Sequence, residues 1–254
     1  MEIPPSFLCD YHVHTNISAC ARPEMTLDRI IERAQRRGYR VLGLSDHAHP
    51  ETWGRIVALR KQVDSLATSI QVHLGCEVDV LPDGSLAVSD DELAALDFVL
   101  GAPTHPLQMY DPDGAGKDAR REQIEQWFAL TESTCDHPVI DVIAHPLRGL
   151  HGGFEAEPLT EQLEQKRVER LLDKLYAAGF ALELAEPLEN RRTAFEGTRR
   201  FYRAAERRGF LFAPGSDAHG LDRLGSQCHA LWLYRDLGLD ESRIWRPDAR
   251  RRRR

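Results

Sequence analysis

Histidines and carboxylates recur along the chain in short groups of residue types that bind metals. Neutral imidazoles suit Zn, Fe, Mn or Ni, and carboxylates complete the coordination of such ions. The groups, in chain order, are Asp10-Tyr11-His12-Val13-His14-Thr15, Ser45-Asp46-His47, Gly75-Cys76-Glu77, Thr104-His105, Ala144-His145-Pro146 and Gly215-Ser216-Asp217-Ala218-His219. If folding gathers these groups, they can bind a cluster of divalent metal ions.

The spacing within the groups indicates separate roles. On a strand, His12 and His14 point to the same face because they lie two residues apart. Glu77 is suited to bridge two cations, and its charge offsets their mutual repulsion. We interpret Asp10 and Asp46 as acceptors that orient an imidazole through its far N–H. The other histidines are expected to be surface or structural residues: His49, His73, His137, His151 and His229.

The groups follow apolar segments that read as strands, with amphipathic helical patterns between them. The predicted strands are 7–13, 40–44, 71–80, 97–100, 139–144, 181–184 and 210–214. The first predicted helix begins after Thr26 and ends at Gly38. Further helices are predicted over 53–66, 119–135, 159–178 and 193–208, and a final helix after 221.

Repeated strand–helix units imply parallel strands with right-handed crossovers. Seven units predict an α/β fold, a closed or nearly closed TIM-like barrel, with an open doubly wound sheet as the alternative. The barrel would bring the ends of the strands to one face, where barrel active sites lie. We expect a single domain over 1–245 and a disordered basic tail over 246–254, which ends in the arginine run 250–254.

Composition narrows the function classes. The 254 residues are 42% hydrophobic and 29% charged, as in globular proteins, and the net charge of −7 argues against a nucleic-acid coat or a binder of anionic membranes. No apolar run reaches the ~18 residues of a membrane span, and the N-terminus lacks a signal-peptide pattern, so we expect a cytoplasmic protein. Five cysteines at irregular spacings predict reduced thiols.

Together the six groups resemble the motifs of the PHP (polymerase and histidinol phosphatase) family, from Asp10 to His219. The resemblance implies a distorted seven-stranded (β/α)7 barrel with up to three metal ions (Zn, Mn or Fe). By position, the first ion would bind His12, His14, Glu77 and Asp217. The second would bind Glu77, His105 and His145, and the third would bind His47 and His219. Many members supply a further histidine to the third ion where this chain has Cys20, whose thiolate would favour Zn.

Such a cluster suits hydrolysis of phosphoesters by metal-activated hydroxide. We expect Glu77, Asp217 and His219 to take part in catalysis, with His219, His14 or a metal-bound water protonating the leaving group. Candidate arginines for holding the phosphate are Arg22, Arg148, Arg191 and Arg192. Short loops and the lack of a basic, aromatic-interleaved patch favour a small phosphomonoester, as in histidinol phosphatases, over nucleic acid. A nucleotide or oligonucleotide phosphoesterase and a non-catalytic metal-binding module remain the alternatives.

Overall fold

The computed structural model describes residues 4–109, 117–150, 159–184 and 194–247. Within these ranges, strands and helices alternate along the chain. The strands are β1 (Cys9–Val13), β2 (Val41–Leu44), β3 (Gln71–Asp79), β4 (Phe98–Ala102), β5 (Val142–Ile143), β6 (Ala181–Leu184) and β7 (Phe212–Pro214). The helices are α1 (Leu27–Arg36), α2 (Pro50–Asp64), α3 (Asp90–Leu93), α4 (Lys117–Ser133), α5 (Gln165–Ala178), α6 (Ala194–Arg207) and α7 (Cys228–Asp236).

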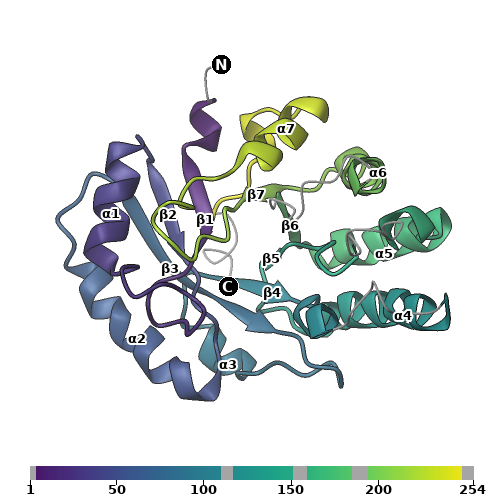
Figure 1. Ribbon diagram of the computed structural model, residues 1–254, viewed down its shortest axis with the longest axis horizontal. Coiled ribbons are helices and arrows are strands. Elements are labelled where there is room, and N and C mark those ends of the chain that lie inside the picture. The colour runs from purple at the N-terminus through teal and green to yellow at the C-terminus, as the bar shows by residue number, and fades with distance from the viewer. Residues whose placement is uncertain (1–3, 110–116, 151–158, 185–193, 248–254) are drawn as a thin grey trace.

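The strands form one parallel sheet in which spatial order follows chain order from β1 to β7. A parallel bridge joins Val13 to Ala218, just beyond β7, and the amide of His14 donates to the carbonyl of Ala218 at 3.1 Å. The sheet therefore curls into a nearly closed barrel, with β1 and β7 meeting at the seam (Figure 1). A doubly wound sheet would reverse its strand order at a switch point, so this alternative is excluded.

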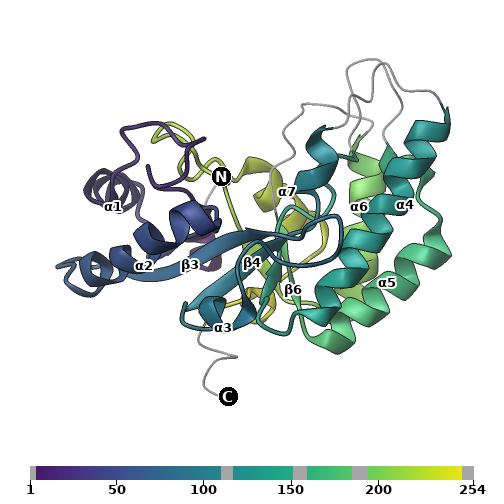
Figure 2. The same cartoon turned by 90° about the horizontal axis from the view of Figure 1, so that it is seen from below.

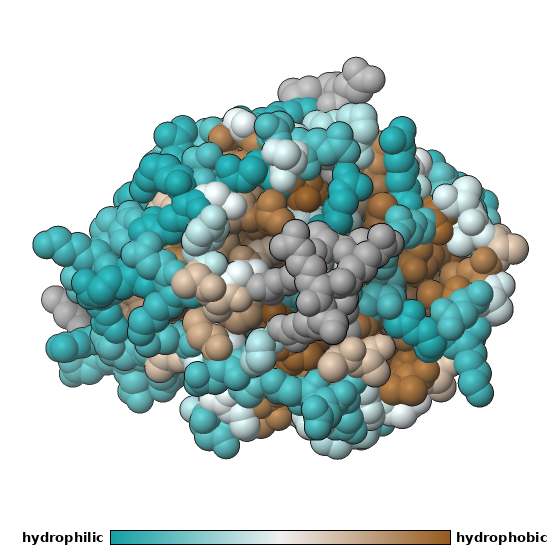
Figure 3. Space-filling view, turned by 180° about the vertical axis from the view of Figure 1, so that it is seen from behind, coloured by the Kyte–Doolittle hydropathy of each residue, from teal (hydrophilic) through white to brown (hydrophobic). Residues whose placement is uncertain are grey.

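Helices pack around the outside of the strands. Figure 2 shows α4, α5 and α6 side by side on one flank and α1 and α2 on the other. In α1, the predicted apolar face is confirmed, since Ile30, Ile31 and Ala34 are buried. The chain leaves this helix through Gly38, whose φ of 75° favours glycine. On the face seen in Figure 3, hydrophilic side chains cover much of the surface and apolar residues form smaller patches between them.

Close packing inside the sheet explains the glycine that precedes Glu77 by two residues. Gly75 on β3 is the register partner of Phe98 on β4, and both strands are buried here. A Cβ atom at Gly75 would lie 2.5 Å from the ring of Phe98, which is too close for any side chain. The glycine thus lets the large ring fill the space beside β3 and fixes the strand that carries Glu77.

Besides shifts of two or three residues at the ends of other elements, three elements differ from the predictions. The single helix predicted over 159–178 was wrong, because a 3₁₀ turn (Leu159–Gln162) precedes α5 and packs on α6. Glu161 in this turn accepts the amide of Gly197 on α6 at 2.6 Å. This hydrogen bond ties the turn to α6, so the turn does not continue into α5. β5 is shorter than predicted, since the amide of Ile140 turns back to the carbonyl of His137. Helix α3 was not predicted, although Ser89 and Glu92 form a capping box at its start.

The remaining predictions concern membranes and the tail. Among the residues that the structure describes, none of the helices combines the length and apolarity needed to cross a membrane. Trp245 is buried, and Arg246, where we placed the start of the tail, forms an ion pair with Glu241 at 2.8 Å. The arginine run 250–254 lies outside the described residues.

Candidate metal centre

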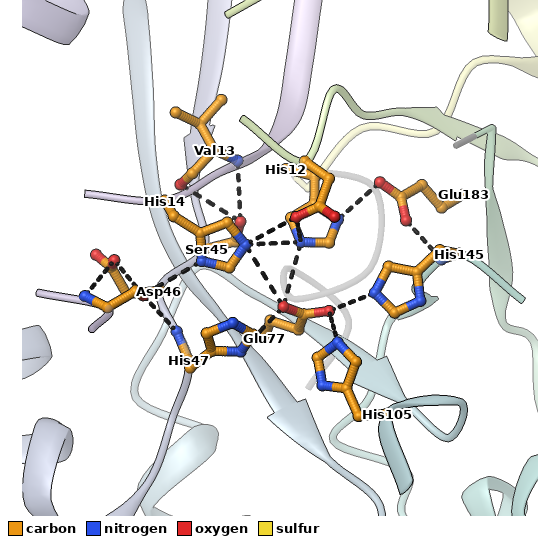
Figure 4. Close-up of polar contacts among 12 residues, drawn as sticks. His12, Val13, His14, Ser45, Asp46, His47, Glu77, His105, His145 and Glu183 are labelled. Carbon is orange, nitrogen blue, oxygen red and sulfur yellow. Dashed lines mark hydrogen bonds and ion pairs between the residues drawn. The ribbon is translucent and has the colours of Figure 1, made fainter. Parts of the chain in front are cut away.

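Glu77 lies at the centre of a ring of imidazoles that come from four different strand ends (Figure 4). Its side chain is fully buried. One oxygen, Oε1, lies 2.7 Å from Nε2 of His145 and 3.2 Å from Nε2 of His105. The other, Oε2, lies 3.3 Å from Nε2 of His12 and 3.2 Å from Nδ1 of His47. Each carboxylate oxygen therefore faces its own set of imidazoles.

The four residues expected around a first ion converge within hydrogen-bonding distance. Nε2 of His12 and Nε2 of His14 are 3.1 Å apart. Oδ1 of Asp217 lies 3.4 Å from the former and 3.1 Å from the latter. Oε2 of Glu77 lies 3.5 Å from Nε2 of His14. These nitrogens and oxygens all point to one small volume between β1, β3 and the segment after β7.

A third set of imidazoles lies beside this volume. Among the described residues, three groups each bring one possible ligand atom per residue, an imidazole nitrogen or a carboxylate oxygen, within 4.8 Å of one another. The groups are His14, His47 and His219; His12, His14 and Glu77; and His47, Glu77 and His105. The rings of His14 and His219 stack with their centroids 4.1 Å apart. Because His219 and His47 are partly exposed whereas His12 and His14 are buried, the cluster opens on their side.

Carboxylates and a hydroxyl hold the far nitrogens of the rings. Nδ1 of His12 lies 2.8 Å from Oε1 of Glu183, and Nδ1 of His105 lies 2.5 Å from Oδ1 of Asp79. Nδ1 of His145 lies 3.0 Å from the hydroxyl of Thr104. An ionised carboxylate only accepts hydrogen bonds, so in the neutral ring it places the proton on Nδ1 and leaves the lone pair on Nε2. Nε2 is the nitrogen that His12 and His105 turn toward Glu77.

Asp46 acts on His14 through Ser18. The hydroxyl of Ser18 donates to Oδ1 of Asp46 at 2.7 Å and lies 3.2 Å from Nδ1 of His14. Its single proton is used on Asp46, so it accepts the Nδ1–H of His14. Asp46 also accepts from the amide and hydroxyl of Thr15, which anchors the loop after β1. The orienting role predicted for Asp46 is thus indirect.

The contact predicted for Asp10 was wrong. Its Oδ1 accepts the backbone amides of His12 at 3.3 Å and Ser216 at 3.0 Å, not a ring N–H. The ring of His12 turns instead toward β6, where Glu183 takes the expected role. Burial raises the pKa of Asp10 to about 7 despite these hydrogen bonds. Asp10 therefore ties β1 to the loop that carries Asp217.

The electrostatics of the metal-free chain are those of a compact salt-bridge network. Burial opposes the charge on Glu77, but the charges of His105 and His12 hold its pKa well below the ordinary value. Burial likewise opposes the charge on His105, yet Glu77 and Asp79 raise its pKa to about 10. Burial lowers the pKa of His47 to about 3. Without metal, protons on His12 and His105 balance the buried carboxylates.

The donor set fits divalent metal ions. Oε2 of Glu77 is buried and has no hydrogen-bond partner among the described residues, although three imidazoles surround it. Nitrogens as close as those of His12 and His14 repel each other unless a proton or a cation lies between them or beside them. Imidazole nitrogens and carboxylate oxygens in this number are typical ligands of Zn, Mn or Fe.

The arginine and cysteine candidates are placed differently. Arg148 is largely buried, and its Nη1 donates to Oδ2 of Asp217 at 2.9 Å. Arg22 is exposed and pairs with Asp222 at 2.9 Å. Cys20 is exposed and belongs to none of the three groups of possible metal ligands found among the described residues. Arg191 and Arg192 lie outside the described residues.

Glu183 and Asp79 were not identified as site residues from the sequence, although the sequence around each contains a feature that points to it. Glu183 is a charged residue inside the apolar strand β6, where burial demands a partner. Asp79 follows Glu77 by two residues and so shares its face of β3. Of the histidines expected to be structural, His137 bonds to Asp90 and to the carbonyl of Gly84, whereas His49 lies 3.8 Å from Asp79. His151 lies outside the described residues.

Comparison with known proteins gives one family. The sequence profile of the PHP domain matches residues 10–187. The chain is 26% identical over 230 residues to a DNA polymerase/3'-5' exonuclease PolX of Bacillus subtilis. This match covers 85% of the chain but only 35% of the length of that protein. It is 22% identical over 250 residues to a probable phosphatase of Thermoanaerobacter sp., with 94% of this chain and 90% of that protein covered.

A solved structure shares the fold. The histidinol phosphate phosphatase of Lactococcus lactis, crystallised with Zn, L-histidinol and phosphate, superposes with a TM-score of 0.66 at 15% identity. The match covers 91% of this chain and 94% of the other. At this identity the likeness shows the barrel fold that the strand order also shows.

Proposed function

Since the chain belongs to the PHP domain family, we propose that it is a metal-dependent phosphoesterase and that its substrate is a small phosphomonoester. The observation that carries the proposal is the position of Glu77, with one oxygen toward His105 and His145 and the other toward His12, His14 and His47. A carboxylate shared in this way is suited to bridge a cluster of cations.

The residues divide into ligand sets as the family resemblance implies. His12, His14, Glu77 and Asp217 would hold one ion, and Glu77, His105 and His145 a second. His47 and His219 would hold a third, with Cys20 proposed as a further ligand. When bound, such ions supply a water of lowered pKa as nucleophile and neutralise charge on the phosphoryl oxygens.

Arg148 is the protein group best placed to bind the phosphate. Its Nη1 donates a hydrogen bond to Asp217. Its Nε is buried without a hydrogen-bond partner among the described residues. An unpaired guanidinium N–H beside the cluster is suited to donate a hydrogen bond to an anionic oxygen. We propose that Arg148 orients the phosphoryl group against the cluster.

His219 and Asp217 form the outer rim of the cluster. Nδ1 of His219 donates to the carbonyl of Asp217 at 2.9 Å, which leaves the lone pair of the neutral ring on Nε2. Burial lowers the pKa of His219, so the ring is neutral near pH 7. A neutral ring with its lone pair on Nε2 is suited to bind a cation, and this favours ligation over proton donation by His219.

Two supports favour a small substrate of the histidinol phosphate kind. The structural neighbour of Lactococcus lactis is a histidinol phosphate phosphatase, and the Thermoanaerobacter relative is named a probable phosphatase. The PolX relative instead favours a nucleotide or oligonucleotide phosphoester. The rival classes therefore differ in the leaving group and not in the cluster.

A substrate panel tests the proposal. Chelator-stripped protein is reloaded separately with Zn, Mn or Fe and assayed with p-nitrophenyl phosphate, histidinol phosphate, nucleoside monophosphates and short oligonucleotides. We expect metal-dependent release of phosphate, fastest with a small monoester. Preferential cleavage of oligonucleotides would replace our substrate class with the nucleic-acid alternative. A fully loaded protein that turns over none of these esters would refute the enzyme and leave a metal-binding module.

A further inference from the structure

Glu183 contacts both halves of the cluster, although it is not among the ligands. Its side chain is almost completely buried, on β6. Oε1 lies 2.8 Å from Nδ1 of His12, and Oε2 accepts the backbone amide of His145 at 2.6 Å. Figure 4 shows this carboxylate between the two histidines, on the side away from Glu77.

On the His12 side, the contact selects a tautomer. A carboxylate can only accept, so Nδ1 of His12 must carry the proton. Nε2 then presents its lone pair to the space shared by His14, Glu77 and Asp217. Without a fixed acceptor, the neutral ring could place its proton on Nε2, where it would block a cation.

On the His145 side, the contact holds an unusual backbone. His145 has a φ of 26°, a conformation that residues other than glycine rarely adopt. The short bond from its amide to Oε2 of Glu183 favours this conformation, in which Nε2 of the ring reaches Oε1 of Glu77. Such strain persists only where the surroundings hold it.

Space for the carboxylate comes from Gly215, the first residue of the Gly215-Ser216-Asp217 segment. A Cβ atom at this position would lie 1.9 Å from Oε1 of Glu183 and 2.8 Å from Cβ of His12. Neither atom can yield easily, because both residues are buried. Glycine is thus required here so that Glu183 can reach the ring of His12.

We propose that Glu183 is a positioning residue that holds both the ring of His12 and the backbone of His145. The absence of a side chain at Gly215 leaves the space that the carboxylate of Glu183 occupies. Glu183 thereby couples the two ligand sets that share Glu77. The inference rests on the metal-dependent site proposed above, and it adds a residue pair that sets metal affinity without contacting the ions.

The substitution Glu183→Gln tests the coupling because an amide has one acceptor where the carboxylate has two. If the amide nitrogen faces His12, that ring must carry its proton on Nε2. If it faces His145, two N–H groups meet where one bond of 2.6 Å stood. Either orientation disturbs one ligand set. We expect Co²⁺ affinity of the stripped protein to fall ~10–100-fold, as is common when a partner of a metal-bound histidine is lost.

Gly215→Ala should act in the same way from a different residue, because its methyl group displaces the carboxylate. Tyr202→Phe is the matched control. The hydroxyl of Tyr202 donates to the backbone carbonyl of Glu183 at 2.6 Å, so its loss perturbs the same strand but leaves the carboxylate in place. We expect Tyr202→Phe to bind Co²⁺ as the wild type does.

Titration with Co²⁺, followed by visible absorption, gives both the affinity and the ligand field, and far-UV circular dichroism checks the fold. Wild-type affinity and spectrum in a folded Glu183→Gln protein would overturn the proposal. If that variant does not fold, Gly215→Ala decides, and loss of the fold in both would assign Glu183 a structural role instead. A wild-type protein that binds Co²⁺ but hydrolyses no phosphoester would refute the proposed function alone.

Discussion

Replacing Glu77 by glutamine removes one negative charge from the centre of the cluster and leaves its shape nearly unchanged. Oε1 faces His145 at 2.7 Å and Oε2 faces His12 at 3.3 Å, so the side chain serves two ligand sets at once. Glutamine keeps one oxygen and replaces the other with an amide nitrogen that has no lone pair to offer. Whichever way it is oriented, one set loses its ligand from this residue.

The expected loss can be bounded from below. Partners that only orient a ligand commonly contribute 10–100-fold to metal affinity or activity, so a shared anionic ligand should contribute at least ~100-fold. That factor corresponds to about 2.8 kcal/mol, since each tenfold change is about 1.4 kcal/mol. The true loss should be larger, because the carboxylate charge also offsets the mutual repulsion of the cations and the amide does not.

Competition with a chromophoric chelator measures the affinity, and kcat/KM with p-nitrophenyl phosphate measures the activity. Glu125→Gln is a matched control, since it makes the same change at an exposed residue of α4 whose partner, Arg167, lies on α5 and not in the cluster. We expect the control to resemble the wild type. Near-normal metal content and turnover in Glu77→Gln would show that Glu77 does not bridge two ions.

Three further predictions follow from the same geometry. Arg148→Gln should raise KM for phosphomonoesters about 10–100-fold with a smaller effect on kcat, and an unchanged KM would remove Arg148 from the phosphate site. Against the effect of burial, neighbouring carboxylates raise the pKa of His105 to about 10 and hold the pKa of His12 well above its ordinary value. Without metal, both rings are therefore in the protonated, cationic form at pH 7. Loading should release about two protons and affinity should rise with pH, whereas calorimetry without any dependence on the buffer's ionisation enthalpy would contradict this. If Cys20 binds the third ion, thiol labelling should slow on metal loading, and a rate independent of metal would exclude it.

The barrel could be predicted because each strand–helix unit carries its own local pattern. In α1 the apolar spacing and Gly38 gave the element nearly to its ends. The start of α5 could not be found in this way, because the turn over 159–162 is set by contact with Gly197 on α6. Such contacts are not visible in local periodicity.

The convergence of these histidines and carboxylates was predictable from residue types at strand ends, whereas their supporting partners were only partly so. Asp46 was identified, but its path through Ser18 depends on how the loop after β1 folds back. Asp10 was assigned to a ring that Glu183 holds instead, and the choice between them is made by the pairing of strands distant in sequence. Adjacency in the chain does not settle which carboxylate a buried ring will face.

We propose that the residues around Glu77 form a multinuclear metal site that hydrolyses phosphoesters. The most direct test is elemental analysis of protein purified without chelator, together with phosphatase activity measured during stepwise reloading of stripped protein. We predict at least ~2 transition-metal ions per chain, with activity rising as the shared site fills. Less than ~1 ion per chain, with none regained on adding metal, would contradict the account.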